Sequence, residues 1–199
     1  MLLDSRLCGN ITKVAIARCV WQVTSITESN VEKLVYLSLG SNLGSPEMEL
    51  RRAIENLALL GTVSKVSSFY KTEPVERTAQ PWFVNCAVEL KTDKMPRQLI
   101  KGILKLEESM GRKRTQDKGP RNIDIDILLF GNSVVDTKEL TIPHPAMHQR
   151  RFVLEPLAEI APQQRHPVLK KTIRELRDAL PAGQAVQKIT GTNKISKEE

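Results

Sequence analysis

Apolar and polar residues alternate strictly in the stretch GPRNIDIDILLFG, residues 119–131. A period of two is typical of a half-buried β-strand, because successive side chains point to opposite faces of a sheet. The isoleucines fall on one face, and Asp124 and Asp126 fall on the other, roughly 6–7 Å apart at the rise of a strand. We expect Leu128 and Phe130 to continue the aspartate face, so that this face is not simply solvated. Two like charges this close are unfavourable unless a cation lies between them.

Hydrophobic patterning predicts the remaining elements in a regular order. Strands are predicted at 34–40, 62–70, 83–90 and 123–129, and helices are predicted to begin at Pro46 and Pro96 and to end near Gly61 and Gly111. The order β-α-β-β-α-β predicts a ferredoxin-like α+β fold, with a mainly antiparallel sheet and helices on its faces. Helical patterns at about 146–160 and 169–180 predict a C-terminal helical extension.

The chain divides into three parts by composition. Residues 1–33 show no clear period and no signal-peptide core, so we expect an N-terminal extension of unknown role. Residues 34–180 are expected to form one domain, and residues 181–199 a polar C-terminal tail.

Composition is that of a globular protein: 199 residues, 40% apolar and 27% charged. Three irregularly spaced cysteines argue against a disulfide framework or a zinc site and favour a reducing, cytoplasmic location. No apolar run approaches the roughly 18 residues of a membrane span. The net charge of +7 indicates an anionic partner, such as a nucleic acid, a nucleotide or another phosphorylated ligand.

A basic loop precedes the two aspartates. The segment GRKRTQDKGPR, residues 111–121, holds Arg112, Lys113, Arg114, Lys118 and Arg121 against one aspartate. Arginines bind phosphate oxygens bidentately. Magnesium takes one or two carboxylates together with phosphate oxygens and water. The loop and the strand together therefore predict a magnesium–polyphosphate site.

A histidine between two prolines follows in TIPHPAMHQRRF, residues 141–152. The prolines hold His144 in a rigid turn, so we expect it to face a ligand. His148 and His166 lack such a context and are expected at the surface.

Six segments in a fixed order resemble the 6-hydroxymethyl-7,8-dihydropterin pyrophosphokinases of folate biosynthesis. They are YLSLGSNLG, SSFYKTEPV, QPWFVNCAVEL, LEESMGRKR, GPRNIDIDILLFG and LTIPHPAMHQRRFVLEPLAEIAP, over roughly residues 34–168. The resemblance implies a ferredoxin-like fold and an ATP-dependent transfer of pyrophosphate to the hydroxymethyl oxygen of the pterin, with release of AMP. It also implies a monomer that binds ATP and the pterin, and neither nucleic acid nor membrane.

The resemblance assigns the nucleotide side of the site. Two Mg²⁺ ions are expected at Asp124 and Asp126, and Arg112, Arg121 and Asp126 are the expected catalytic residues. Asp126 is the preferred acceptor of the hydroxyl proton. The residues expected to bind ATP are Glu107, Arg112, Arg114, Arg121, Thr141, His144 and Arg150.

The resemblance also assigns the pterin side. Aromatic rings on both faces of a flat heterocycle fix it by stacking, and polar groups must meet its edge. The expected residues are Phe83 and Phe152 for the two faces, Thr72 and Asn85 for the edge, and Val75 for an apolar wall.

A nucleotidyltransferase of the DNA-polymerase-β type also uses an Asp-x-Asp strand for magnesium. In such an enzyme a Gly-Ser element precedes the aspartates by about a turn and a helix, whereas Gly40-Ser41 lies about eighty residues upstream. The products separate the two enzymes: AMP for a pyrophosphokinase, and pyrophosphate for a nucleotidyltransferase.

An RNA-binding module is the non-enzymatic alternative, because ferredoxin-like sheets with basic surfaces often bind RNA. Such modules need exposed aromatic residues on central strands. The DIDIL segment offers acids there, which would repel phosphate in the absence of a metal.

Overall fold

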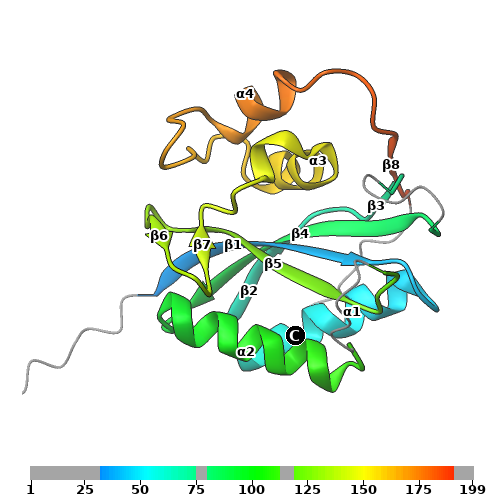
Figure 1. Cartoon of the computed structure of the whole chain (residues 1–199), viewed down its shortest axis with the longest axis horizontal. Coiled ribbons are helices and arrows are strands. Elements are labelled where there is room, and N and C mark those ends of the chain that lie inside the picture. Colours follow the sequence, from blue (N-terminus) through cyan, green and yellow to red (C-terminus); the bar gives the residue numbers. More distant parts are fainter. Residues whose placement is uncertain (1–31, 75–79, 113–118, 191–199) are drawn as a thin grey trace, which may run out of the picture. The chain divides into compact units, whose positions relative to one another are not determined.

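The predicted order of strands and helices is present in the computed structural model, which describes residues 32–74, 80–112 and 119–190. The elements are β1 (Lys33–Ser41), α1 (Pro46–Asn56), β2 (Thr62–Val66), β3 (Tyr70–Thr72), β4 (Phe83–Thr92), α2 (Pro96–Ser109) and β5 (Asp124–Phe130). The described strands pair antiparallel, and helices lie on both faces of the sheet (Figure 1). The ferredoxin-like α+β prediction is therefore confirmed.

The strand predicted over residues 62–70 is interrupted. β2 pairs with the C-terminal half of β4, and β3 pairs with its N-terminal end beside Asn85. At the break, the N–H of Ala87 donates to Ser67 Oγ at 2.9 Å, and the N–H of Ser67 donates to the carbonyl of Ala87 at 2.9 Å. The serine side chain thus replaces a backbone group of the ladder, which allows the strand to change direction without leaving the Ala87 amide unpaired.

The sheet separates two apolar cores. Its strand order is β5-β1-β4-β3-β8, where β8 is Val186–Lys188, and β2 also pairs with β4. α1 and α2 cover one face, and α3 (Arg151–Ile160) covers the other, with α4 (Ile173–Asp178) packed on α3 (Figure 1). Neighbouring residues of β1 therefore enter different cores: Leu37 packs with α1 and α2, and Tyr36 packs with α3 and α4.

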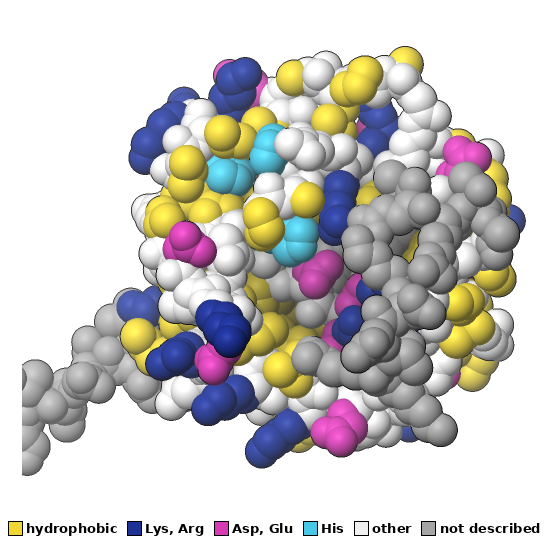
Figure 2. Space-filling model, viewed as in Figure 1, with side chains coloured by type: hydrophobic (Ala, Val, Ile, Leu, Met, Phe, Trp, Pro, Cys, Tyr) yellow, Lys and Arg dark blue, Asp and Glu magenta, His cyan; other side chains and the backbone are white. Residues whose placement is uncertain are grey.

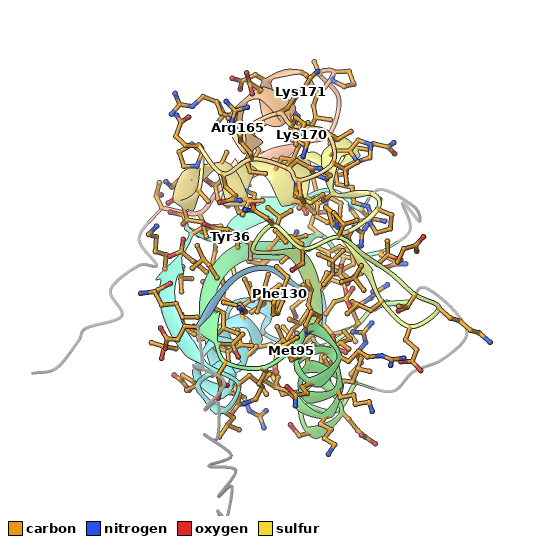
Figure 3. The ribbon with its side chains drawn as sticks, turned by 90° about the vertical axis from the view of Figure 1, so that its left-hand side faces the viewer. Tyr36, Met95, Phe130, Arg165, Lys170 and Lys171 are labelled. Carbon is orange, nitrogen blue, oxygen red and sulfur yellow. The ribbon has the colours of Figure 1, made fainter. Side chains whose placement is uncertain are left out.

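A β-bulge changes the alternation of β5. Ile127 pairs with Leu37 and Leu129 pairs with Tyr36, so Leu128 is the extra residue between them. Leu128 packs, as predicted, on the face of the aspartates against α3. Phe130 lies in the opposite core with α1 and α2, whereas Tyr36 lies on the α3 side (Figure 3). The prediction that Phe130 continues the aspartate face is wrong, because one extra residue reverses the alternation.

The helices predicted at about 146–160 and 169–180 correspond to α3 and α4, and both are shorter. α3 begins after a 3-10 turn at Met147–Gln149. α4 begins only at Ile173, where Thr172 and Glu175 cap it reciprocally. Thr172 Oγ1 accepts the N–H of Glu175 at 3.2 Å, and Glu175 Oε2 accepts the N–H of Thr172 at 2.7 Å.

The turn between α3 and α4 encloses His166, which was predicted at the surface. Only 5% of this residue is exposed, and its Nδ1 accepts the backbone N–H groups of Val168 and Leu169 at 3.3 and 3.1 Å. The prediction for His166 is therefore wrong. The histidine stabilises its own turn, a local role that hydrophobic patterning does not reveal.

Residues beyond 180 are not only a polar tail, since Val186–Lys188 form the edge strand β8 beside β3. Two of its three residues have exposed side chains, so the sequence carries no apolar strand signal there. The described ranges belong to one compact unit, Val31–Glu199. None of the helices in these ranges has both the length and the apolar character of a membrane span.

Candidate active site

The two aspartates of β5 lie beside β1 in the sheet. Ser38 pairs with Asp126, and Gly40 pairs with Asp124, so these residues share one face. A cavity of about 340 Å³ lies against this face, and the start of α3 contributes to its lining. Acidic, basic and histidine side chains gather around a hollow in the surface (Figure 2).

Most of the predicted site residues converge on this cavity. The ten that line it are Thr72, Phe83, Asn85, Arg112, Arg121, Asp124, Asp126, His144, Arg150 and Phe152. Glu107 and Thr141 are not part of the lining; Glu107 is buried, and Thr141 is exposed on the two-residue strand β7 (Thr141–Ile142). Val75 and Arg114 lie outside the described residues.

Sequence reasoning missed five lining residues: Ser38, Gly40, Glu73, Pro74 and Gln80. Ser38 and Gly40 are two residues apart on a predicted strand, so they were expected to share a face. Which face, and beside which strand, depends on the register with β4 and β5, and a single sequence does not reveal register.

Gly40 leaves space for the side chain of Asn85. A Cβ atom at position 40 would lie 2.6 Å from Asn85 Oδ1, which is closer than nonbonded atoms approach. We expect Gly40→Ala to displace the Asn85 amide and to raise the KM for the pterin about tenfold or more, since a polar ligand edge loses a partner. The KM for ATP should stay within about twofold of wild type, and the measurement is steady-state kinetics with each substrate varied.

A Gly44→Ala variant is the matched control, because no atom lies within 4 Å of a Cβ there. Its positive φ of 63° costs stability but does not disturb the cavity. Equal effects of Gly40→Ala on both KM values would contradict a role confined to the pterin side.

Two arginines neutralise Asp124. Arg112 Nη1 lies 2.6 Å from Asp124 Oδ1, and Arg121 pairs with the other oxygen of the same carboxylate. The arginine side chains are 20% and 26% exposed, so these ion pairs are partly shielded from water. Asp124 therefore holds both guanidinium groups at the cavity. This is one of the two carboxylates that we expected, from the sequence, to bind a metal.

Glu107 supports this arrangement from below. Its Oε1 accepts the N–H of Ile125 at 2.7 Å and a hydrogen bond from Arg112. Glu107 is 2% exposed, and burial raises its pKa to about 7, although Arg112 and the Ile125 amide act in the opposite direction. Glu107 thus anchors Arg112 and the start of β5, and it does not line the cavity.

The pKa of Glu107 predicts a pH-dependent stability. Between pH 4.5 and about 7 the folded protein keeps a proton on Glu107 that the unfolded chain has released. The free energy of unfolding of the wild type should therefore fall with rising pH in this interval, relative to Glu107→Gln. Urea unfolding of both proteins at pH 5 and pH 8 measures the difference, with the exposed neighbour Glu108→Gln as control. A difference that is constant with pH would contradict the raised pKa.

Asp126 differs from Asp124, because no side-chain hydrogen bond or ion pair joins it to another described residue. Burial, and then the charge of Asp124, raises the pKa of Asp126 to about 6, while Arg150, Arg112 and Arg121 lower it. A largely enclosed carboxylate without a direct partner is unfavourable and fits a cation ligand.

The donor set fits magnesium. No cluster of three or more His, Cys, Asp or Glu side chains in the described ranges could hold a metal by itself. Asp124 and Asp126 offer two carboxylates at the cavity, on the edge strand β5 that pairs with β1. This is what Mg²⁺ uses when phosphate oxygens and water complete its coordination.

His144 and Arg150 face the aspartates from the segment that precedes α3. His144 Nδ1 accepts the N–H of Ala146 at 3.2 Å, so a neutral ring carries its proton on Nε2. Burial, and then the charge of Arg150, lowers the pKa of His144. The N–H of His144 donates to the carbonyl of Leu128 at 3.0 Å and ties this segment to β5. The site therefore offers a neutral N–H donor beside a guanidinium group.

Asn42 joins the ends of two loops at the edge of the cavity. Its Oδ1 accepts the N–H of Arg121 at 2.8 Å, and its Nδ2 donates to Gln80 Oε1 at 3.3 Å and to the Pro81 carbonyl at 3.4 Å. Asn42 is only 2% exposed. It thus fixes the backbone of Arg121 relative to the segment that leads into Phe83.

The other end of the cavity suits a flat polar ligand. Asn85 Nδ2 donates to Thr72 Oγ1 at 2.7 Å, and these residues are 4% and 1% exposed. The bond leaves the Asn85 oxygen, its second amide hydrogen and the Thr72 hydroxyl hydrogen available. The rings of Phe83 and Phe152 line the same cavity, and the Arg150 guanidinium lies 5.7 Å from the centre of the Phe152 ring.

Known proteins with similar sequences include several that are named as pyrophosphokinases. Residues 36–162 match the family model described as 7,8-dihydro-6-hydroxymethylpterin-pyrophosphokinase (HPPK). The 2-amino-4-hydroxy-6-hydroxymethyldihydropteridine pyrophosphokinase of Bacillus subtilis is 44% identical over 135 residues, which is 67% of this chain and 81% of the relative. The protein of the same name from Aquifex aeolicus is 39% identical over 143 residues, which is 72% of this chain and 89% of the relative.

Solved structures show the same fold in a longer protein. The wild-type HPPK-DHPS of Plasmodium falciparum, in a crystal structure with pteroate, superposes with a TM-score of 0.62 at 18% identity. The superposition covers 74% of this chain and 44% of that chain, so this chain spans less than half of the longer protein. The family model and the curated relatives each match well over half of the residues. The chain therefore belongs to the 7,8-dihydro-6-hydroxymethylpterin-pyrophosphokinase family.

Proposed function

We propose that the chain transfers pyrophosphate from ATP to the hydroxymethyl oxygen of 6-hydroxymethyl-7,8-dihydropterin, giving AMP and the pterin diphosphate in folate biosynthesis. Membership of the pyrophosphokinase family supports this reaction. The observation that carries it is the convergence of the proposed metal, phosphate and pterin residues on one cavity. ATP is the co-substrate, and the enzyme is a transferase.

The acidic end of the cavity binds the nucleotide phosphates with Mg²⁺. Asp124 and Asp126 would hold two ions, which neutralise charge on the transferred group and polarise its phosphorus–oxygen bonds. Arg112, Arg121 and Arg150 bind the remaining phosphate oxygens as bidentate donors. His144, Arg114 and Thr141 complete the proposed ATP contacts.

The charged groups of the cavity support this assignment. The carboxylates of Glu73, Asp124 and Asp126 line it together with the guanidinium groups of Arg112, Arg121 and Arg150. A triphosphate without a cation would lie close to these carboxylates, so they make nucleotide binding depend on the cation.

The ion pairs of Asp124 define what changes on binding. Arg112 and Arg121 hold both oxygens of this carboxylate in the described structure. With the Asp124 carboxylate engaged by a cation, the two guanidinium groups would donate to phosphate oxygens of the nucleotide instead. Both arginine side chains are already ordered at the cavity before the nucleotide binds. Their side-chain entropy is therefore lost during folding and not on binding.

The opposite end of the cavity binds the pterin. Asn85 and Thr72 hydrogen-bond its polar edge, and Phe83 and Phe152 contact its two faces. Val75 provides an apolar contact. Asp126 lies on the strand face shared by both halves, and we assign to it the acceptance of the hydroxyl proton as the oxygen attacks the phosphorus.

We further propose a cytoplasmic monomer without a nucleic-acid partner. Cys86 is a free thiol that is fully buried, and burial raises its pKa, which suits a protein that needs no disulfide. Sedimentation of the full chain, with and without RNA, tests the monomeric state and the lack of a nucleic-acid partner, and a dimer at micromolar concentration or a complex with RNA would contradict them.

Incubation of the purified chain with Mg-ATP and 6-hydroxymethyl-7,8-dihydropterin tests the reaction. We expect AMP and the pterin diphosphate in equal amounts, and no AMP when the pterin or the metal is omitted. Release of inorganic pyrophosphate with a nucleotidylated acceptor would instead indicate a nucleotidyltransferase and reject the proposal.

A further inference from the structure

The walls at the pterin end of the cavity contact a segment that lies outside the family match. That match ends at residue 162, whereas residues 184–188 contact both walls of the cavity. Val186 pairs with Thr72 in the register of β8 and β3, and the N–H of Glu73 donates to the carbonyl of Ala185 at 3.2 Å. The C-terminal segment is therefore a support of the lining residues Thr72 and Glu73.

One side chain in this segment bridges the two walls. Gln184 Nε2 donates to the carbonyl of Glu73 at 3.1 Å, and Gln184 Oε1 accepts the N–H of Phe152 at 3.3 Å. Glu73 follows β3, and Phe152 is the second residue of α3. Both residues line the cavity, and Gln184 is half-buried behind them. A single planar amide thus connects the strand wall to the aromatic wall.

The bond to Phe152 also satisfies a helix end. The first N–H groups of a helix have no partner within it. Arg150, the N-cap of α3, provides no capping hydrogen bond from its side chain. Gln184 supplies the acceptor from more than thirty residues away, so the position of α3, and of the Phe152 ring with it, depends on the C-terminal segment.

We infer that Gln184 is a positioning residue for the pterin, which sets the separation between Phe152 and the strand that carries Thr72. The inference rests on the proposed function, because it assumes that the pterin lies between these walls. Stacking is sensitive to the spacing of the rings, so a shift of one wall weakens pterin binding and leaves the phosphate end unchanged.

Two substitutions separate positioning from simple helix capping. Gln184→Ala removes both hydrogen bonds. Gln184→Glu keeps an acceptor for the Phe152 N–H, and its negative charge near the start of α3 favours the helix. It loses the donor to Glu73, however, and places a carboxylate against a carbonyl oxygen. The control is Gln187→Ala, an exposed glutamine of β8 without a side-chain hydrogen bond in the described structure.

We expect both Gln184 variants to raise the KM for the pterin about three- to tenfold, the effect of one or two hydrogen bonds. The KM for ATP should change by less than about twofold, and Gln187→Ala should match wild type. The melting temperature should fall for Gln184→Ala and fall less for Gln184→Glu, whose charge favours the helix. Steady-state kinetics with AMP detection and thermal unfolding provide these values.

If Gln184→Glu had the pterin KM of the wild type, Gln184 would act only as a helix cap, and the inference would be overturned. This outcome can be measured even if Gln184→Ala does not fold. Equal increases of both KM values would also overturn the inference. If wild type and Gln187→Ala produce AMP, such results reject only the role of Gln184. If neither produces AMP, the proposed function fails, and the inference fails with it.

Discussion

We expect Asp126→Asn to lower the rate of AMP formation by about three orders of magnitude, which is the scale of losing an electrostatic group that acts on the transition state. Asparagine has almost the same shape, so the cavity keeps its form. The substitution removes one of the two carboxylates at the cavity and with it a negatively charged ligand for the cation. Single-turnover kinetics at several magnesium concentrations measures the loss and shows whether excess metal restores activity.

The same substitution should not destabilise the protein. The folded pKa of Asp126 is about 6, above its ordinary value of 3.8, so the ionised group lowers stability as the pH rises through this interval. At pH 7.5 Asp126→Asn should therefore unfold at the wild-type temperature or above it. Asp136→Asn, an exposed acid on the two-residue strand β6 (Val135–Asp136), is the control. Near-normal AMP formation by Asp126→Asn would reject the metal assignment.

We expect Arg112→Ala to lower kcat about 10²- to 10³-fold, with a smaller change in the KM for ATP, since the guanidinium binds charge that develops during transfer. The variant should also lose stability. Without Arg112, the buried carboxylate of Glu107 keeps the Ile125 amide but loses its counter-charge. Steady-state kinetics and urea unfolding separate the two effects.

The double variant Arg112→Ala/Glu107→Gln distinguishes catalysis from stability. A neutral glutamine still accepts the Ile125 N–H, so stability should return towards wild type, whereas kcat should stay low. Arg97→Ala, which removes an exposed arginine of α2 paired with Glu139, is the matched control. Recovery of kcat in the double variant would mean that Arg112 acts only by holding the structure, and a loss confined to the KM for ATP would make it a binding residue alone.

The features that were predicted correctly from the sequence are those indicated by neighbouring residues. Alternation in IDIDI predicted a strand with two carboxylates on one face, and prolines at the starts of α1 and α2 marked both helices. The positions of Phe83 and Phe152 came only from the resemblance to a family, because an aromatic residue on a strand or helix usually belongs to the core.

The parts that were missed depend on pairing between distant segments. The bulge that turned Phe130 to the other core arises from the register of β5 against β1. Strand β8 exists because β3 offers a free edge, and its own residues show no strand pattern. His166 is buried by a turn that it stabilises itself. None of these contacts leaves a period or a composition that can be read along the chain.

The sequence by itself determined the order of the elements, the two carboxylates on one strand face and the basic loop before them, because these follow from the period and charge of neighbouring residues. Only the tertiary structure decided what surrounds those groups. It placed both arginines on Asp124 and gave the Asp126 side chain no direct partner among the described residues. It also put Glu107 beneath the site and joined the two walls of the pterin end through Gln184. The physical reason is that ion pairs, burial and the spacing of the cavity walls depend on strand register and helix packing. These bring together residues as far apart in the sequence as Glu73 and Gln184.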